Sequence, residues 1–123
     1  MVLKFRAWHM PFGYKGPMQE MVYGKASSIL AFEEMSPDEY IVEQFTGLKD
    51  VNGKAIYEGD IVKSSYKYAQ PKISEVIMEY GNSYILGEDL STGNEMLVSD
   101  HINDIEVIGN MHENLELLGA QHD

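Results

Sequence analysis

The sequence predicts a mainly β protein, a small SH3-like or partly open β-barrel with an N-terminal β layer and short helical turns. Three observations predict this fold. Between residues 57 and 108, about five short strand-like segments alternate with turn residues, as in small barrels. The pair Asn52-Gly53 is typical of a type I′ hairpin turn, because both residues tolerate positive φ. The step Gly59-Asp60 precedes Ile61-Val62, and a glycine there indicates a bulge or sharp bend.

Residues 1–45 are expected to form the N-terminal β layer. The segment Leu3–Trp8 alternates with period two, as does a strand with one face in the core. Prolines and glycines then interrupt residues 9–17, which are expected to form a loop. Residues 18–23 are expected to pair back as a second strand.

The stretch that follows carries mixed helix and strand signals. Residues 27–35 are compatible with a strand or with one helical turn. Ser36-Pro37 followed by Glu39 is typical of a helix start, with Ser36 as the capping residue. Because Tyr40–Phe45 favours a strand, only a single turn is expected before it.

Residues 46–118 are expected to form the barrel-like part, and residues 1–123 together a single domain. The strand expected at 73–80 has apolar residues on both faces, which is typical of a strand that is central or crosses a barrel. The other strands are expected at 55–57, 61–66, 83–86, 95–98 and 104–108, with an acidic loop at 87–94 and a helical turn at 114–118.

The composition excludes several classes of site. The 123 residues include no cysteine, so there is no disulfide framework, thiolate metal site or cysteine nucleophile. No apolar run approaches the roughly 20 residues that a membrane span requires. The N-terminus lacks the apolar core of a signal peptide. We therefore expect a cytoplasmic protein without a membrane partner.

The net charge of −11 is unevenly distributed. Residues 1–72 hold all nine Lys and Arg and nine Asp and Glu, so their charges balance. Residues 73–123 hold the remaining eleven acidic residues and no Lys or Arg. This acidic part is expected to repel phosphates and anionic membrane surfaces and to favour basic partners. A solvated acidic face is the simpler interpretation.

Gln44–Val62 (QFTGLKDVNGKAIYEGDIV) is the most distinctive run of residues. Together with LKFRAW at Leu3–Trp8 and IEVIGNMHENLELL at Ile105–Leu118, it resembles the YopX-like family of small proteins from phages and prophages of low-GC bacteria. The resemblance implies a β-barrel-like fold, a phage or prophage origin and a bacterial host, and it implies no chemistry. The chain departs from the family pattern at Leu115, where proline is usual, and at 9–16, where an Asp-rich turn is usual.

The sequence indicates no catalytic or metal site. Phosphate-binding glycine motifs and the G-x-S-x-G nucleophile elbow are absent. Asp60 follows Gly59 at a tight turn, where a carboxylate is expected to accept backbone hydrogen bonds. The most metal-like cluster has a spacing that matches no zinc motif, so no metal is expected. Its members are His101, Asp104, His112 and Glu113.

Two sets of residues are candidates for binding. Trp8 falls on the polar side of its strand, where it is either an exposed aromatic anchor or a packing residue under the following loop. A tyrosine stripe, close in sequence to Lys63, Lys67 and Lys72, either stacks bases or packs across strands. It comprises Tyr66, Tyr68, Tyr80 and Tyr84. The candidate acidic face comprises Glu75, Glu79, Glu88 and Asp89.

The missing motifs, the barrel pattern and the resemblance together favour a non-enzymatic, self-associating interaction module. Its expected partners are further copies of the chain, or a host or phage protein. Two alternatives stay open. One is a single-stranded nucleic-acid binder that uses the tyrosines, although the net charge disfavours nucleic acid. The other is an acidic decoy in which residues 73–123 occupy a host DNA-binding protein. A hydrolase is least favoured, and no cofactor is expected.

Overall fold

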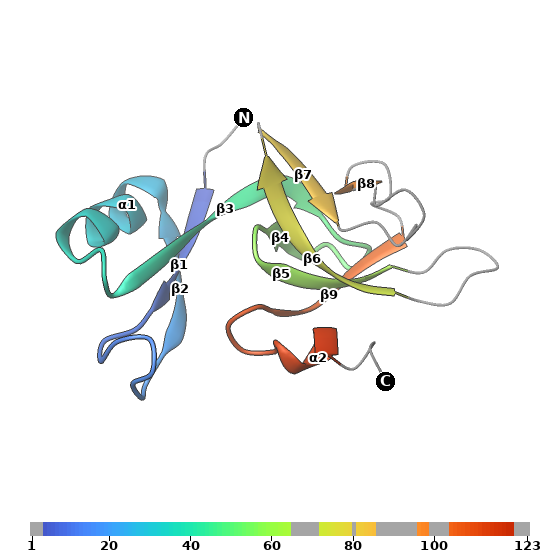
Figure 1. The fold of residues 1–123 in the computed structure, drawn as a ribbon. Helices are drawn as coiled ribbons and strands as arrows, with labels where there is room; N and C mark the ends of the chain where they lie inside the picture. Colours follow the sequence, from blue (N-terminus) through green and yellow to red (C-terminus); the bar gives the residue numbers. More distant parts are fainter. Residues whose placement is uncertain (1–3, 65–71, 80, 86–95, 99–103, 120–123) are drawn as a thin grey trace. The chain divides into compact units, whose positions relative to one another are not determined.

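The structure is a computed structural model of the 123-residue chain. It describes residues 4–64, 72–79, 81–85, 96–98 and 104–119. The chain divides into two compact units, Met1–Phe45 and Thr46–Asp123. Strands dominate the described part of both units (Figure 1), so the predicted mainly β fold is confirmed.

The N-terminal unit is a small antiparallel sheet with a helix on it. Its elements are β1 (Lys4–His9), β2 (Glu20–Lys25), α1 (Ala26–Met35) and the start of β3 (Tyr40–Lys49). β1 lies between β2 and β3, with Arg6 opposite Tyr23 on one side and Glu43 on the other. α1 packs on β1 and β2 (Figure 1), and its Ile29 is fully buried. β1 differs from a strand with one polar face, because Arg6 and Trp8 are buried as well as Ala7.

The ambiguous stretch of the sequence forms α1, a ten-residue helix, and neither the strand nor the single helical turn that the sequence suggested. Ala26–Met35 consists largely of residues with favourable or neutral helix propensity, and only Ile29 is buried against the sheet. The helix ends where the sequence suggested a helix start. The N–H of Ser36 donates to the carbonyl of Phe32, and Pro37 disfavours a helical conformation in the residue before it. The expected single turn is confirmed, because the N–H of Glu39 donates to the carbonyl of Ser36 before β3 begins.

The C-terminal unit is built on a five-stranded sheet in the order β8-β7-β6-β5-β9. Its elements are β4 (Ala55–Tyr57), β5 (Asp60–Ser64), β6 (Lys72–Glu79), β7 (Asn82–Ile85), β8 (Met96–Leu97), β9 (Ile105–Asn110) and α2 (Glu116–Gly119). The β4 strand instead pairs with β3 at the edge of the other sheet. Six buried residues form the core, namely Ile56, Val62, Val76, Ile85, Val98 and Ile105.

The described strands do not form a closed barrel. They belong to two separate sheets, in the orders β2-β1-β3-β4 and β8-β7-β6-β5-β9. The SH3-like closure therefore stays a prediction.

The expected irregularity near Gly59 has two parts. Gly59 has a φ of 86°, which favours glycine, and the pairing of β5 with β9 shifts between Ile61 and Val62.

The predicted chain reversal after β3 is confirmed, but the type I′ turn over Asn52-Gly53 is wrong. Of these two residues only Gly53 has a positive φ, at 81°. The turn begins at Asp50, whose carbonyl accepts from the N–H of Gly53 at 2.9 Å. The N–H of Asp50 in turn donates to the carbonyl of Lys54 at 2.8 Å. The two hydrogen bonds and the positive φ of Gly53 are typical of a type I turn followed by a left-handed glycine.

The side chain of Asp50 explains why the turn starts one residue early. Its Oδ1 accepts from the N–H groups of Asn52 and Lys54, both at 2.9 Å. Its Oδ2 accepts from the N–H of Val107 on β9 at 2.8 Å. Beside it, the N–H of Val51 donates to the carbonyl of Ile105 at 3.1 Å. Asp50 is 6% exposed and joins the turn to β9.

Asp60 has the structural role that the sequence predicted. It is 2% exposed, and its Oδ2 accepts from the N–H of Tyr57 at 2.8 Å across the turn between β4 and β5. Gly59 is fixed on both sides, because its N–H donates to Val76 and its carbonyl accepts from Met111. The carboxylate therefore stabilises a tight turn.

The C-terminal turn is organised by Asn110. Its Oδ1 accepts from the N–H groups of His112 and Glu113, at 2.9 and 3.0 Å. Its own N–H donates to Oδ1 of Asn114 at 3.2 Å. The Asn114 side chain lies so close to Gly109 that a Cβ there would stand 2.6 Å from its Oδ1. This turn leads into α2, which confirms a terminal helical turn.

We predict that Asp50→Asn lowers the free energy of unfolding by about 2–3 kcal/mol, because the amide cannot accept all three bonds and its NH₂ group would face an N–H donor. Urea denaturation at pH 7 measures the loss. Asp104→Asn is the matched control, since Asp104 is exposed. Equal stability of the two variants would contradict the assigned role of Asp50.

The same carboxylate is expected to make stability depend on pH. Burial alone would raise the pKa of Asp50, but the N–H groups of Val107, Lys54 and Asn52 and the charge of Lys54 outweigh it, so the pKa lies below its ordinary value of 3.8. A lowered pKa gives stability that is complete above about pH 5 and is lost as the pH falls through the folded-state value.

We therefore expect the stability difference between the wild type and Asp50→Asn to be largest at neutral pH and to shrink towards about pH 2. Urea unfolding across this range measures it. A difference that is constant with pH would show that the charge of Asp50 does not contribute.

Candidate functional site: an apolar surface on the N-terminal unit

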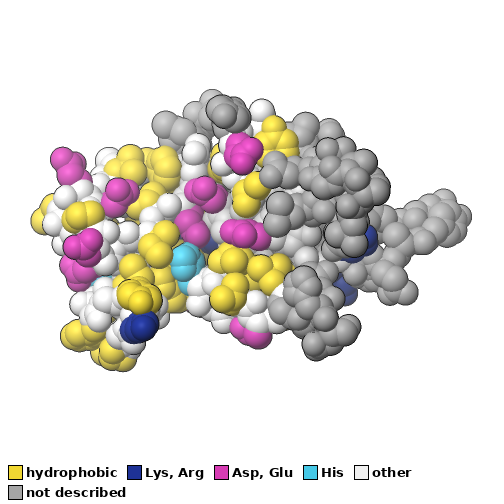
Figure 2. Space-filling model, in the orientation of Figure 1, with side chains coloured by type: hydrophobic (Ala, Val, Ile, Leu, Met, Phe, Trp, Pro, Cys, Tyr) yellow, Lys and Arg dark blue, Asp and Glu magenta, His cyan; other side chains and the backbone are white. Residues whose placement is uncertain are grey.

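Within the ranges that the structure describes, exposed large hydrophobic side chains are concentrated in the N-terminal unit. Among the described residues ten such side chains are exposed, and eight of them lie in this unit. These eight are Phe12, Tyr14, Met18, Tyr23, Leu30, Phe32, Met35 and Ile41. The other two, Val51 and Leu115, lie in the C-terminal unit. Figure 2 shows hydrophobic side chains over α1 and the β1–β2 loop, with acidic side chains among them. Contiguous exposed apolar patches often mark interaction sites, so these eight side chains are candidates for one.

The β1–β2 loop, residues 10–19, is held in one conformation by Gln19. Its Nε2 lies 3.1 Å from the carbonyl of Gly13, 2.8 Å from that of Tyr14 and 3.0 Å from that of Gly16. A single amide with two N–H groups thus serves three backbone acceptors, one bond being shared. The loop is therefore organised before any partner binds, which lowers the entropy cost of binding.

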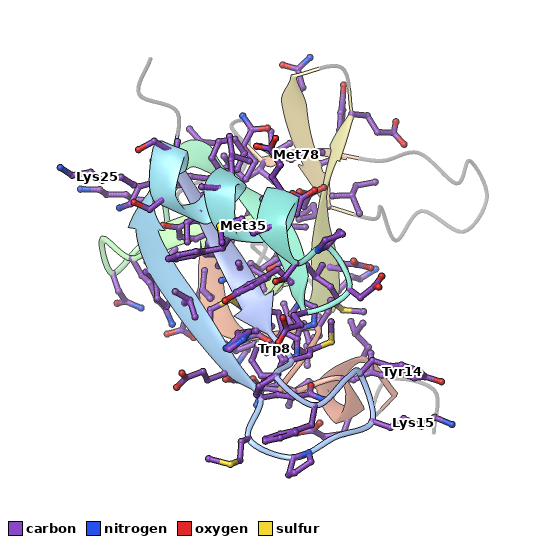
Figure 3. All side chains as sticks on the ribbon, turned by 90° about the vertical axis from the view of Figure 1, so that its left-hand side faces the viewer. Trp8, Tyr14, Lys15, Lys25, Met35 and Met78 are labelled. Atoms are coloured by element: carbon purple, nitrogen blue, oxygen red, sulfur yellow. The ribbon has the colours of Figure 1, made fainter. Side chains whose placement is uncertain are left out.

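Trp8 packs at the base of the β1–β2 loop. It is 6% exposed, and its Nε1 donates to Oε1 of Gln19 at 2.8 Å. Figure 3 shows Trp8 at the base of the loop and Tyr14 and Lys15 at its outer side. Of the two interpretations drawn from the sequence, the structure shows the packing residue and not the exposed aromatic anchor.

The side chains at the loop tip point to solvent. Lys15 Nζ lies 5.4 Å from the centre of the Tyr14 ring, within the range of a cation–π contact. Met18 is exposed and has a φ of 63°, a conformation uncommon for a residue with a Cβ. No acidic residue lies between residues 10 and 19. The loop tip is therefore apolar and carries one positive charge.

The outer side of α1 also exposes apolar groups. Ile29 faces the sheet, so residues on the opposite side of the helix, Ser27, Leu30, Ala31, Glu34 and Met35, face away from it, and all five are exposed. Met35 is 81% exposed and Leu30 43% exposed. Phe32 is partly covered, because its ring stacks on Tyr40 with 5.8 Å between centroids.

A buried ion pair fixes the centre of the N-terminal sheet. Arg6 Nε donates to Oε1 of Glu43 at 2.9 Å, and the two residues lie directly opposite each other on β1 and β3. Arg6 is 3% exposed and Glu43 is 6% exposed. Such a pair is costly to break from one side, because the remaining charge stays buried. It sets the register that aligns β1 with β3.

The candidate residues of the C-terminal unit are only partly placed. Tyr66, Tyr68, Tyr80, Glu88 and Asp89 lie outside the described residues. Tyr84 is half-buried on β7 opposite Ile77 of β6. By the alternation of β6, Glu75 and Glu79 project from the same sheet face as Ile77 and Tyr84, away from the core side chain of Val76.

This arrangement disfavours base stacking at Tyr84. A nucleic acid that reached the ring would meet the carboxylates of Glu75 and Glu79 on the same face. Tyr84, Glu75 and Glu79 therefore share one face of the sheet, and the two carboxylates oppose the nucleic-acid hypothesis.

The metal-like cluster is not assembled in the described part of the chain. His101 lies outside the described residues. Glu113 Oε2 accepts from Nδ2 of Asn110 at 3.2 Å, so its carboxylate is used in the C-terminal turn. Within the ranges that the structure describes, no group of three or more His, Asp and Glu side chains could hold a metal ion.

The two described helices include none long and apolar enough to cross a membrane.

Sequence reasoning missed the loop and helix surface. The loop sequence holds Phe12, Tyr14 and Met18 between prolines and glycines, and aromatic residues at turn positions are a signal for an exposed recognition loop. The role of Gln19 has no local signal, because its acceptors are backbone carbonyls brought near by the loop conformation.

The structure describes a small β protein of two units whose N-terminal unit exposes an apolar surface. The sequence model of the family described as YopX protein matches residues 4–119, so this chain belongs to the YopX family. The predicted family resemblance is confirmed. The chain is also similar to the crystal structure of protein EF1440 from Enterococcus faecalis, with 27% identity and a TM-score of 0.56. The match covers 96% of this chain and 99% of that chain. No curated protein matches the chain.

We predict that Gln19→Ala loosens the β1–β2 loop and lowers the free energy of unfolding by about 1–2 kcal/mol, because it removes the bonds to the loop and to Trp8. Trp8 is the single tryptophan, so the tryptophan fluorescence reports on this site alone. Because Trp8 loses its hydrogen-bond partner, its fluorescence emission should shift to longer wavelength. Gln19→Glu keeps the acceptor for Trp8 but loses the loop donors, so its emission should change less.

Trypsin should cleave after Lys15 faster in both variants than in the wild type, since a loosened loop fits a protease more easily. Ser27→Ala, at an exposed residue, is the control, and its rate of cleavage after Lys15 should equal that of the wild type. Unchanged cleavage in both Gln19 variants would show that the loop is held by other contacts.

Proposed function

We propose that this chain is a non-enzymatic interaction module that associates with further copies of itself through the apolar surface of its N-terminal unit. The concentration of exposed hydrophobic side chains in that unit carries the proposal. Fully burying an exposed apolar side chain of this size stabilises a complex by roughly 1.5–3 kcal/mol, and association must offset about 4–15 kcal/mol of lost translational and rotational freedom, so several of these side chains must be buried together.

The buried charged groups support a non-enzymatic role. Among the described residues these groups are Arg6, Glu43, Asp50 and Asp60. Arg6 pairs with Glu43, and the two aspartates accept backbone N–H groups at turns. In the same described part, no buried side-chain nitrogen or oxygen lacks a hydrogen-bond partner. Catalytic sites commonly hold groups that structural bonds do not satisfy.

The family adds no activity to the proposal. The description of the matched family and the name of the Enterococcus faecalis neighbour state no reaction or ligand. A phage or prophage origin, a bacterial host and a cytoplasmic location stay predictions from the sequence. The oligomeric number is part of what the following experiment determines.

We predict that the wild type self-associates with increasing concentration in sedimentation velocity. A triple variant, Tyr14→Ser with Leu30→Ser and Met35→Ser, should associate at least about tenfold more weakly, because it removes three exposed apolar groups. The matched control is Val51→Ser with Leu115→Ser, which removes the two exposed groups of the C-terminal unit.

Circular dichroism should show that all three proteins are folded. A wild type that stays monomeric up to millimolar concentration would overturn self-association. Equal weakening by the control variant would show that the surface is not specific to the N-terminal unit.

A further inference from the structure

The turn between β3 and β4 holds a reactive pair of residues. Of the six asparagines in the sequence, only Asn52 is followed by glycine. In such a pair the backbone nitrogen of the glycine can attack the side-chain amide carbon of the asparagine, since glycine has no Cβ to block the approach. Asn52 and Gly53 are both exposed. Apart from the adjacent residues, no atom lies within 4 Å of the position that a Cβ of Gly53 would take.

The folded turn keeps the two reacting groups of this pair apart. The N–H of Gly53 donates to the carbonyl of Asp50 at 2.9 Å, so its nitrogen is held in a hydrogen bond. The Nδ2 of Asn52 donates to Oε2 of Glu106 on β9 at 3.1 Å, which turns the amide towards β9. In a type I turn the third residue has a ψ near about 0°, and this rotation directs the next backbone nitrogen away from the side chain. The reaction therefore requires the turn to open.

We propose that Asn52 is a site of spontaneous deamidation, and that the product releases the β3–β4 turn from β9. The backbone nitrogen of Gly53 forms a bond with Cγ of Asn52, and the bond between Cγ and Nδ2 breaks. The side-chain nitrogen leaves as ammonia and takes the proton of the Gly53 N–H. Water then opens the resulting succinimide ring at one of its two carbonyl carbons, which gives aspartate or isoaspartate. Water is the only co-reactant, and the inference is independent of the proposed self-association.

Both products weaken the bonds that join the turn to β9. The new carboxylate replaces an amide that donates to Glu106, so a hydrogen bond becomes a repulsion between like charges. Isoaspartate also adds one main-chain atom between the N–H groups of residues 52 and 54. Oδ1 of Asp50 accepts from both groups at 2.9 Å and cannot keep both bonds when their spacing changes. The same carboxylate holds Val107, so the connection to β9 loosens with it.

The reaction would act as a clock on the C-terminal unit. It is irreversible, and its extent grows with the time that the protein has existed. Its rate in the folded protein is set by how often the turn opens, because the closed turn separates the reacting atoms. A local opening at the surface of the unit is thereby converted into a permanent change at the joint between the hairpin and the five-stranded sheet.

Peptide mapping measures the reaction at this one site. The folded protein and the chain unfolded in urea are incubated in the same mildly alkaline buffer and then digested briefly with trypsin. Lys49 and Lys54 flank the turn, so trypsin releases the peptide Asp50–Lys54. Chromatography with mass spectrometry separates its asparagine, aspartate and isoaspartate forms. Asn82 is the internal control, because it is also exposed but precedes Ser83.

We expect the Asp50–Lys54 peptide to be modified in the folded protein, at least about tenfold more slowly than in the unfolded chain. Folded Asp50→Ala should be modified at an intermediate rate, because its turn opens more often. Asn82 should stay unmodified in the folded protein over the same time. A folded protein that remains unmodified while the unfolded chain reacts completely would overturn the proposed site. Equal rates in the folded and unfolded chains would show that the turn does not hold the groups apart.

The consequence for the turn is measured on the modified protein itself. Modification adds one negative charge, so anion-exchange chromatography separates the modified from the unmodified chains. The isoaspartate form should have an unfolding equilibrium constant about tenfold larger in urea denaturation, as expected for the loss of one or two hydrogen bonds. Asn52→Gln is the matched control. It keeps an amide but closes the corresponding larger ring far more slowly, so its stability should not change during the incubation. Equal stability of the modified and unmodified wild type would overturn the release of the turn from β9.

Discussion

The C-terminal unit depends on the hydrogen bonds made by the backbone groups at the open edge of β9. An edge strand presents N–H and carbonyl groups that have no strand beside them. Here the turn after β3 supplies their partners, because Asp50 accepts from Val107 and Val51 donates to Ile105. These bonds hold the β3–β4 hairpin against the five-stranded sheet. Ile56 of the hairpin and Val62 of the sheet can then share one core. A single buried carboxylate therefore connects local turn geometry with the packing of the unit.

Sequence reasoning succeeded where the determining interactions are local. The strands that became β5 and β6, the reversal after β3 and the role of Asp60 follow from side-chain type and nearby turn residues. It failed where the partner is distant along the chain. Asp50 resembles any polar turn residue, because its third donor, Val107, is 57 residues away. The identity of α1 was also open, since propensity alone does not distinguish its residues from a strand.

The two units use their side chains differently. In the C-terminal unit the described carboxylates Asp50 and Asp60 are buried and hold turns. In the N-terminal unit Gln19 and Trp8 hold a loop, while the side chains on its surface are apolar and exposed. Stability and surface chemistry are thus assigned to separate residues. Substitutions on the exposed side of α1 or at the loop tip change the surface with little effect on the buried bonds.

The ion pair of Arg6 and Glu43 limits how the N-terminal sheet can evolve. Replacing either residue alone leaves an opposite charge buried, whereas replacing both by apolar residues of similar volume is often nearly neutral. Any lineage that loses the pair must therefore cross a poorly stable intermediate or change both positions together. Positions 6 and 43 are expected to be inherited as a unit, so their joint variation among relatives would report the alignment of β1 with β3 independently of any structure.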